Sequence, residues 1–152
     1  MINVNTFIKY KDMFFDIYQY AGPRVNENNL EGGIILTINN TTLIDLEMWD
    51  YIIELWSYIL EGLEYISRET PFECNFPDQP ILLKMTPIKS NVLLEITIEH
   101  TKKVFIDKNI LMKKLCQHII KFFSKIVEIP GISHSYSLEI KRAKHLIENS
   151  QN

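Results

Sequence analysis

The longest helical pattern in the chain begins just after Asp45. Its apolar residues recur at i, i+3, i+4 and i+7, a spacing that places them on one face of an α-helix. These residues are Trp49, Ile52, Ile53, Trp56, Ile59, Leu60 and Leu63. Asp45 is a suitable N-cap, and Thr70-Pro71 prevents the helix from continuing. The sequence therefore predicts a helix from Asp45 to about Ser67, with this face in the core.

Two more helices are indicated in the second half of the chain. Asp107 precedes two adjoining apolar stripes, and Pro130-Gly131 follows them. The stripes consist of Met112, Leu115, Ile119, Phe122 and Ile126, beside Cys116, Ile120, Phe123 and Val127. They predict a helix capped by Asp107 with a wide buried arc. Ser135 or Ser137 is expected to cap a shorter final helix over residues 138–148.

Alternating apolar and polar residues predict strands with one buried face. The alternating positions are Ile34, Leu36 and Ile38; Ile81, Leu83 and Met85; Leu94, Ile96 and Ile98; and residues 104–106. Lys84 and Thr86 are expected to lie on the same solvent face as Glu95 and Glu99 of the next strand, a favourable cross-strand match. We expect a short edge strand over Phe72–Asn75. Residues 7–20 suit either a strand or a helix, and we expect a strand over residues 14–20.

The order of these elements predicts an α+β fold, with one domain over residues 1–152. We expect an antiparallel sheet of four to six strands. The two main helices would pack on one face of it, and a short C-terminal helix would close the chain. A chain of this length can bury a full core without disulfide bonds, and its 46% hydrophobic and 23% charged residues are typical of globular proteins.

The polar side of the first predicted helix carries three tyrosines at a seven-residue spacing, among several carboxylates. We predict that a partner-binding surface forms there from Glu47, Asp50, Tyr51, Glu54, Tyr58, Glu61 and Tyr65. Tyrosine provides contact area at a small loss of side-chain entropy, and carboxylates attract a basic partner. Two other interpretations stay open: the C-terminal helix covers the tyrosines, or they are exposed single side chains without a role.

The net charge of −3 conceals two segments of opposite sign. Residues 45–78 are acidic, with Arg68 as their only base, and residues 101–126 are rich in lysine, with Asp107 as their only acid. Such segments can steer partners, or they can neutralise one another where they pack side by side. The lysine-rich segment lacks arginine and interleaved aromatic residues, and the pI is about 5.8, so we expect no nucleic-acid binding.

No group of residues predicts a metal site, a cofactor site or a catalytic centre. Cys116 and His118 lie two apart, where helical side chains do not face one another, so we expect a core cysteine beside a surface histidine. Ser133-His134-Ser135 lacks the strand–turn–helix setting of a nucleophile and is expected to be a capping loop. Gly32-Gly33 precedes a strand, whereas a phosphate-binding loop follows one. We therefore expect no catalytic residues, no cofactor and no bound metal.

The chain also lacks the signals of export and membrane insertion. Its two cysteines are too few for a disulfide framework, and the N-terminus has no apolar signal core. No stretch is long and apolar enough to span a membrane. We expect a cytoplasmic protein that binds another protein and not a membrane, and the sequence leaves its oligomeric state open.

The layout of the chain resembles that of small single-domain immunity proteins from bacterial polymorphic toxin systems. The resemblance rests on the strand at residues 34–39, the acidic helix at 46–66, the Phe-Pro-Asp-Gln-Pro connector at 76–80 and the strands at 81–106. It implies a protein without enzymatic activity that binds a co-encoded toxin and blocks it. The acidic surface predicted above would face a basic toxin domain. As a likeness of layout, it assigns no residue a role.

Two other functions stay open: a phage or host adaptor with a similar surface, and a small enzyme whose site assembles from residues distant in sequence.

Overall fold

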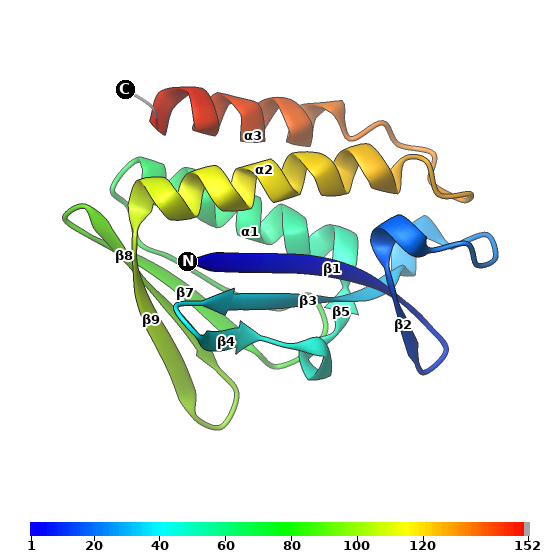
Figure 1. Cartoon of the computed structure of the whole chain (residues 1–152), viewed down its shortest axis with the longest axis horizontal. Helices are drawn as coiled ribbons and strands as arrows, with labels where there is room; N and C mark the ends of the chain where they lie inside the picture. The colour runs from blue at the N-terminus through cyan, green and yellow to red at the C-terminus, as the bar shows by residue number, and fades with distance from the viewer. Residues whose placement is uncertain (151–152) are drawn as a thin grey trace.

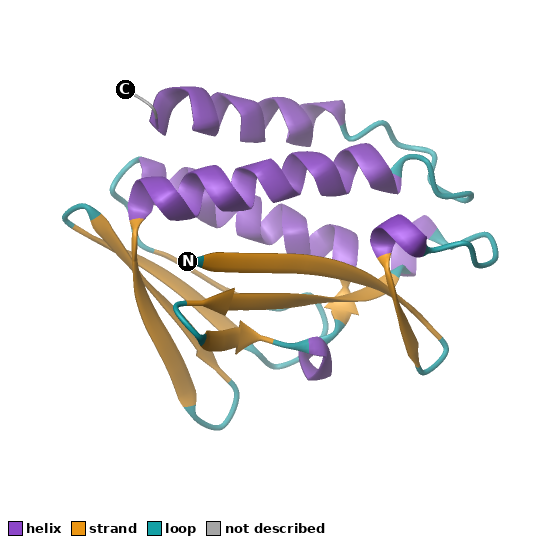
Figure 2. Cartoon of the chain, in the orientation of Figure 1, coloured by secondary structure: helices purple, strands orange, loops and turns teal. Residues whose placement is uncertain are grey.

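The computed structural model describes residues 1–150, which form two antiparallel sheets and three α-helices around one core (Figures 1 and 2). The predicted α+β class is confirmed, with the strands divided between two sheets instead of one. The first sheet contains β1 (Ile2–Tyr10), β2 (Met13–Asp16), β3 (Glu31–Ile38), β4 (Thr41–Ile44) and β5 (Asp50–Tyr51). The second contains β6 (Phe72–Asn75), β7 (Leu82–Ile88), β8 (Asn91–Thr97) and β9 (Thr101–Asp107). The helices are α1 (Ile52–Ser67), α2 (Lys108–Ile126) and α3 (Ser137–Ser150).

The first sheet begins at the N-terminus, where the sequence analysis expected no strand. β1 pairs with both β2 and β3, and its inward positions Ile2, Thr6 and Ile8 are buried. The strand expected over residues 14–20 is only partly correct. β2 ends at Asp16, because the carboxylate of Asp16 accepts a hydrogen bond from the Tyr18 amide at 2.8 Å and caps a short 3₁₀ turn over Ile17–Gln19.

Tight turns set the register of the hairpins. Asn39 and Asn40 join β3 to β4 with φ angles of 50° and 70°, which matches the twist of a two-residue hairpin loop. The edge strand predicted over Phe72–Asn75 is confirmed as β6, which pairs with β7. On the outer face of the second sheet, Lys84 shares the solvent side with Glu95 as predicted; the register places it directly opposite Glu95, which in turn pairs with Lys103. Unlike charges therefore stand opposite one another along this face.

The predicted first helix begins later than expected. Asp45 does act as a cap, but of the 3₁₀ turn η3 (Leu46–Met48), where its carboxylate accepts from the Glu47 amide at 3.0 Å. The chain then pairs with β3 through β5 before α1 starts at Ile52. From there the prediction holds, because the apolar face is buried at Ile52, Ile53, Trp56, Ile59, Leu60 and Leu63. Trp49 lies outside α1 and is half-buried beneath the Lys9 ammonium, 4.2 Å from its ring centroid.

All three helices lie on one side of the sheets (Figure 1). α1 packs against β6 and β7, α2 packs against β1 and β9, and α3 lies along α2. α1 can approach the second sheet closely because Gly62 faces it: a Cβ there would lie 2.7 Å from the Phe72 ring and 2.9 Å from the Met85 sulfur. α2 is capped by Asp107 as predicted, with the Ile110 amide 3.0 Å from the carboxylate.

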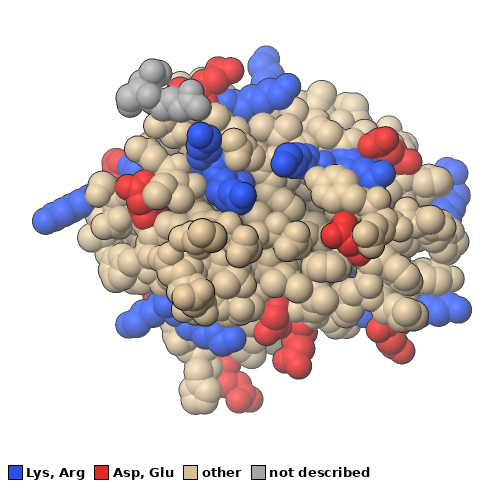
Figure 3. All heavy atoms as spheres, viewed as in Figure 1, with Lys and Arg blue, Asp and Glu red and all other residues tan. Residues whose placement is uncertain are grey.

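The acidic and basic segments contact one another in part. Lys108 at the start of α2 forms an ion pair with Glu69 just beyond α1. Arg142 of α3 donates two hydrogen bonds to the carboxylate of Glu64 on α1. On the face shown in Figure 3, Lys and Arg side chains are interspersed with Asp and Glu. The two charged segments therefore neutralise each other at the Lys108–Glu69 contact, while Arg142 pairs with the acidic segment from α3.

Candidate functional site

Five of the seven residues predicted to bind a partner lie in one line along α1. They are Tyr51, Glu54, Tyr58, Glu61 and Tyr65, and we call this set the α1 stripe. Successive members are three or four residues apart, the spacing that keeps side chains on the same side of a helix. Tyr51 is the N-cap residue of α1, so the stripe runs from the start of the helix to its last turn.

Four members of the α1 stripe have polar groups that are not used within the described chain. Glu61 is exposed, and Tyr51, Glu54 and Tyr58 are half-buried. Across residues 1–150, none of these four side chains makes a hydrogen bond or an ion pair. One oxygen of Glu54, Oε2, is buried without a hydrogen-bond partner. A buried carboxylate oxygen without a donor is unfavourable, and because Oε2 has no exposed surface, a donor from a partner could reach it only if the Glu54 side chain turned outward.

Tyr65, at the far end of the stripe, is held by its neighbours. Its ring meets Phe72 edge-on at 5.1 Å, and the Arg68 guanidinium lies 5.3 Å from the ring centroid. These contacts bury one side of the ring against the core. Tyr65 therefore forms the border of the stripe rather than its centre.

Asp50 does not belong to this surface, and its placement on the exposed side of a helix was wrong. It lies in β5 and is only 2% exposed. Its carboxylate accepts hydrogen bonds from the amides of Tyr51 at 2.7 Å, Asp78 at 3.0 Å and Gln79 at 2.9 Å. Asp50 thus ties the first sheet to the loop that leads into β7. That loop is the Phe-Pro-Asp-Gln-Pro connector of the sequence.

Glu47 is also separate from the α1 stripe. It is exposed, as expected, but lies on η3 and not on α1. Glu64 is on α1 and is held by Arg142, which shows that α3 runs along that flank of the helix. The exposed Glu61 shows that α3 does not cover the outward side. The C-terminal helix therefore leaves Glu61 uncovered, while Tyr51, Tyr58 and Tyr65 are half-buried.

The Ser133-His134-Ser135 loop binds a distant carboxylate. Glu27 accepts hydrogen bonds from the hydroxyl of Ser133 at 2.8 Å, from the hydroxyl of Tyr136 at 2.6 Å and from the Ser133 amide at 2.9 Å. His134 Nδ1 lies 2.7 Å from the same carboxylate. Burial alone would raise the pKa of Glu27, but these hydrogen bonds outweigh it and hold the pKa well below its usual range. Because Ser133 donates to Glu27 and not to His134, the loop is not arranged as an activated nucleophile.

The sequence analysis missed a buried polar contact that involves His118. Cys116 is fully buried, as predicted, and burial raises the pKa of its thiol to about 12. His118 is half-buried instead of lying free on the surface, and its Nε2 is 2.7 Å from the hydroxyl of Thr6. These two residues are 112 positions apart. No local pattern in the sequence could have paired them.

Within residues 1–150, no cluster of three or more His, Cys, Asp or Glu side chains is placed to hold a metal ion. Over the same residues, no helix combines the length and the apolar character that crossing a membrane requires. Comparisons of the chain with models of protein families, with curated proteins and with solved structures find no match.

Proposed function

We propose that this chain is a binding protein without enzymatic activity, and that its partner is another protein that docks on the α1 stripe. One observation carries the proposal: four side chains in a line along α1 keep their polar groups uncommitted, while neighbouring acids such as Asp50 and Glu64 are fully used inside the fold. An aligned set of half-buried tyrosines with unpaired carboxylates suits a protein interface better than a solvated face.

The chemistry of the stripe favours a basic partner. The exposed Glu61 would accept hydrogen bonds from Lys or Arg side chains, and Glu54 would do so once its side chain turned outward. Tyr51 and Tyr58 flank Glu54 along the stripe and would exclude water around that contact. Glu47 lies outside the stripe and would act only at long range, by steering.

A more specific proposal is that the partner is a bacterial toxin with a basic domain, which this chain neutralises in the cytoplasm as an immunity protein. The layout that resembles immunity proteins supports this proposal, as does the α+β fold with an exposed acidic and aromatic helix face. Inhibition would follow from occupation of the toxin's basic site by the α1 stripe. An adaptor would use the same surface but leave its partner active.

The test begins with affinity capture of the chain from its native cells and identification of what it binds. The partner is then produced separately and measured for toxicity to bacteria, with and without the chain. The stripe variant Tyr58→Ala/Glu61→Lys should lose at least about 2 kcal/mol of binding energy, roughly a 30-fold weaker affinity. It should also fail to protect bacteria from the partner.

The matched control is Tyr10→Ala/Glu99→Lys, which makes the same chemical changes at two exposed positions away from α1. This control should bind and protect like the unchanged chain. Equal binding by the stripe variant and the control would remove the α1 stripe as the site. A partner that is bound through the stripe but is not toxic would leave the binding proposal standing and overturn the immunity proposal.

A further inference from the structure

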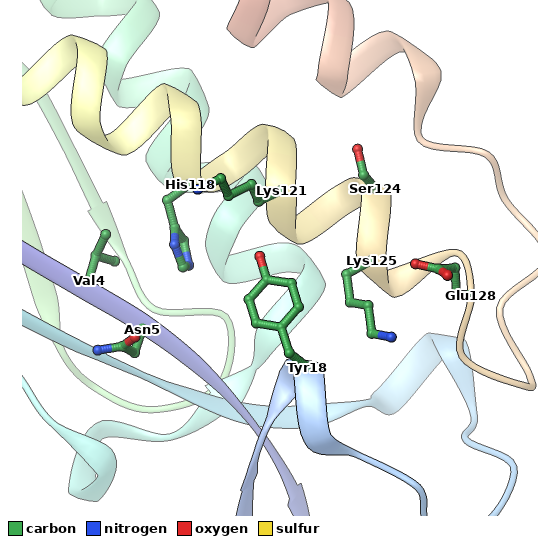
Figure 4. A pocket seen from close by; sticks show the side chains of 8 residues that line it. All are labelled: Val4, Asn5, Tyr18, His118, Lys121, Ser124, Lys125 and Glu128. Atoms are coloured by element: carbon green, nitrogen blue, oxygen red, sulfur yellow. The ribbon is translucent and has the colours of Figure 1, made fainter.

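A second candidate site lies on the other side of α2, where the helix passes over β1 and the 3₁₀ turn at Ile17–Gln19 (Figure 4). An open hollow of about 690 Å³ is present there, within the size range of small-molecule sites. It is lined by Val4, Asn5, Tyr18, His118, Lys121, Ser124, Lys125 and Glu128. In Figure 4 the imidazole of His118 and the hydroxyl of Tyr18 both project into the space between β1 and α2.

The imidazole is held in place from inside the core. Trp56, which is 1% exposed, donates its indole N–H to the hydroxyl of Thr6 at 3.0 Å. That hydroxyl lies 2.7 Å from His118 Nε2. Thr6 is one of only two buried polar or charged residues found among residues 1–150, the other being Asp50. Buried polar groups are tolerated only when they are hydrogen-bonded, so Trp56, Thr6 and His118 depend on one another.

This chain of hydrogen bonds also accommodates a specific form of the imidazole. Because Thr6 accepts from Trp56, its own O–H is available to donate, and the neighbouring acceptor is His118 Nε2. In the tautomer that this donation requires, the ring proton of His118 lies on Nδ1, which has no partner within the described residues; the 2.7 Å distance fits a hydrogen bond in either direction. Burial, with smaller contributions from Lys121 and Lys114, lowers the pKa of His118 to about 4, and Asp16 opposes this slightly. The ring is thus neutral near pH 7, and in this tautomer its Nδ1–H can donate.

Hydrogen-bond donors dominate the hollow. The His118 imidazole and the Tyr18 hydroxyl are neutral donors, and Lys121 and Lys125 add two positive charges one helical turn apart. Glu128 at one end and the neighbouring Asp16 carry the opposing negative charges. Neither forms an ion pair with these two lysines. Within residues 1–150 the two lysines form no ion pair, and two such ammonium groups beside an imidazole and a phenol hydroxyl fit a ligand with several anionic oxygens.

We propose that this hollow binds the phosphoryl group of a small phosphomonoester. The two lysine charges balance a dianion, the neutral His118 supplies a directed N–H, and the exposed Tyr18 ring, 53% accessible, offers a surface for the rest of the ligand. A carboxylate ligand would use only one of the two lysine charges. This site is separate from the α1 stripe and does not depend on the protein-binding function, so either proposal can fail alone.

The test uses the whole chain at pH 7.5, with inorganic phosphate and a nucleoside 5′-monophosphate as probes and acetate and chloride as comparison ions at equal ionic strength. Nitrogen NMR of the histidine rings reports on His118 directly. Phosphate should shift the His118 Nδ1 resonance in a saturable way, with a dissociation constant of about 1 mM or tighter. Acetate should bind at least about tenfold more weakly. A tighter complex with the nucleotide than with phosphate would place the organic group on Tyr18.

Two double variants make the result specific. Lys121→Ala/Lys125→Ala should weaken phosphate binding at least tenfold, while Lys113→Ala/Lys141→Ala, which removes the same charge at exposed positions outside the hollow, should leave it unchanged. Thr6→Val should redistribute the His118 ring proton in the NMR spectrum and weaken binding. The proposal is overturned if phosphate and chloride produce equal shifts, or if the two lysine variants lose affinity equally.

Discussion

Asp50 and Glu27 each join two segments that are distant in sequence by accepting several hydrogen bonds. Asp50 connects β5 to residues 78 and 79, and Glu27 connects the turn after Val25 to the loop between α2 and α3. Both carboxylates are nearly closed off from solvent, with Asp50 2% exposed and the Glu27 side chain 10% exposed. At such sites the loss of a charged acceptor leaves several donors unpaired at once.

Asp50→Ala is therefore expected to lower the free energy of unfolding by about 3 kcal/mol, because three backbone amides lose their acceptor. Asp50→Asn should be less severe but still destabilising, because one carboxylate oxygen becomes an N–H donor facing those amides. Asp78→Asn is the control, since only its backbone contacts Asp50 and its side chain is exposed. Urea unfolding measures all three. A change below about 0.5 kcal/mol for Asp50→Ala would show that these hydrogen bonds do not hold the fold.

Glu27→Gln gives a prediction that depends on pH. The pKa of Glu27 lies below its usual value in the folded protein, so its contribution to stability is complete above the unfolded pKa of about 4.3 and is lost as pH falls toward the folded pKa. The variant should be about 2 kcal/mol less stable at pH 7. The difference should narrow below about pH 4.3, by at most about 1.4 kcal/mol per pH unit.

Unfolding curves at pH 7 and pH 3 measure this difference, with Glu99→Gln as the exposed control. The control should differ little from the unchanged chain at either pH. A gap between Glu27→Gln and the unchanged chain that stays constant from pH 7 to pH 3 would contradict the assignment.

The sequence could indicate roles for individual residues only where neighbours in the chain decide them. Asp107 and Asp45 were identified as caps, because a cap contacts the amides that immediately follow it. Asp50 was misplaced because its partners Asp78 and Gln79 lie far along the chain. The contact between Thr6 and His118 was missed for the same reason, because these residues are 112 positions apart. In each case burial by a distant segment overrode the local pattern.

Among the elements, α1 has the main part in both packing and the proposed binding. Its buried face lies between the two sheets and α2, and its outward side carries the α1 stripe. The apolar spacing predicted this division well after residue 52, since a long helix repeats its pattern over several turns. It could not place the start of the helix, because Trp49, three residues before Ile52, continues the same apolar spacing although it lies between η3 and β5.

Trp56→Ala tests the buried face of α1. Trp56 is 1% exposed, and its indole N–H donates to the Thr6 hydroxyl. The centroid of its ring lies 5.0 Å from that of His118 and 6.2 Å from that of Phe122. Removing the ring should cost about 3–5 kcal/mol of stability through the cavity that it leaves. Thermal and urea unfolding measure the loss. A loss below about 1 kcal/mol would show that Trp56 is not packed in the core as described.

At the scale of the whole molecule, the two sheets share one core instead of forming separate units. Residues of both sheets, including Leu36 of β3, Leu83 of β7 and Leu94 of β8, belong to one buried cluster with α1 and α2. The four-stranded sheet was predicted closely, since its strands follow one another through short turns. The first sheet was not predicted closely, because β1 pairs with β3 across the irregular segment between Tyr20 and Leu30. Such pairing is set by the shared core and not by local sequence.

The fold also leaves the outward side of α1 open while it uses most other acids internally. The central claim is that this open side binds a basic protein. Replacing Glu54 and Glu61 should mainly slow association, more strongly at low salt, because carboxylates steer a basic partner. Replacing Tyr51 or Tyr58 with Ala should mainly speed dissociation, by about 2 kcal/mol if either is at the centre of the interface.

The most direct measurement is the binding kinetics of the Tyr51→Ala/Glu54→Gln/Tyr58→Ala variant with the captured partner, at two salt concentrations. Unfolding curves first establish that the variant keeps its fold, which it should, because these side chains lie outside the buried core. The account predicts slower association, most clearly at low salt, and dissociation at least about tenfold faster. Unchanged association and dissociation rates in the folded variant would contradict it.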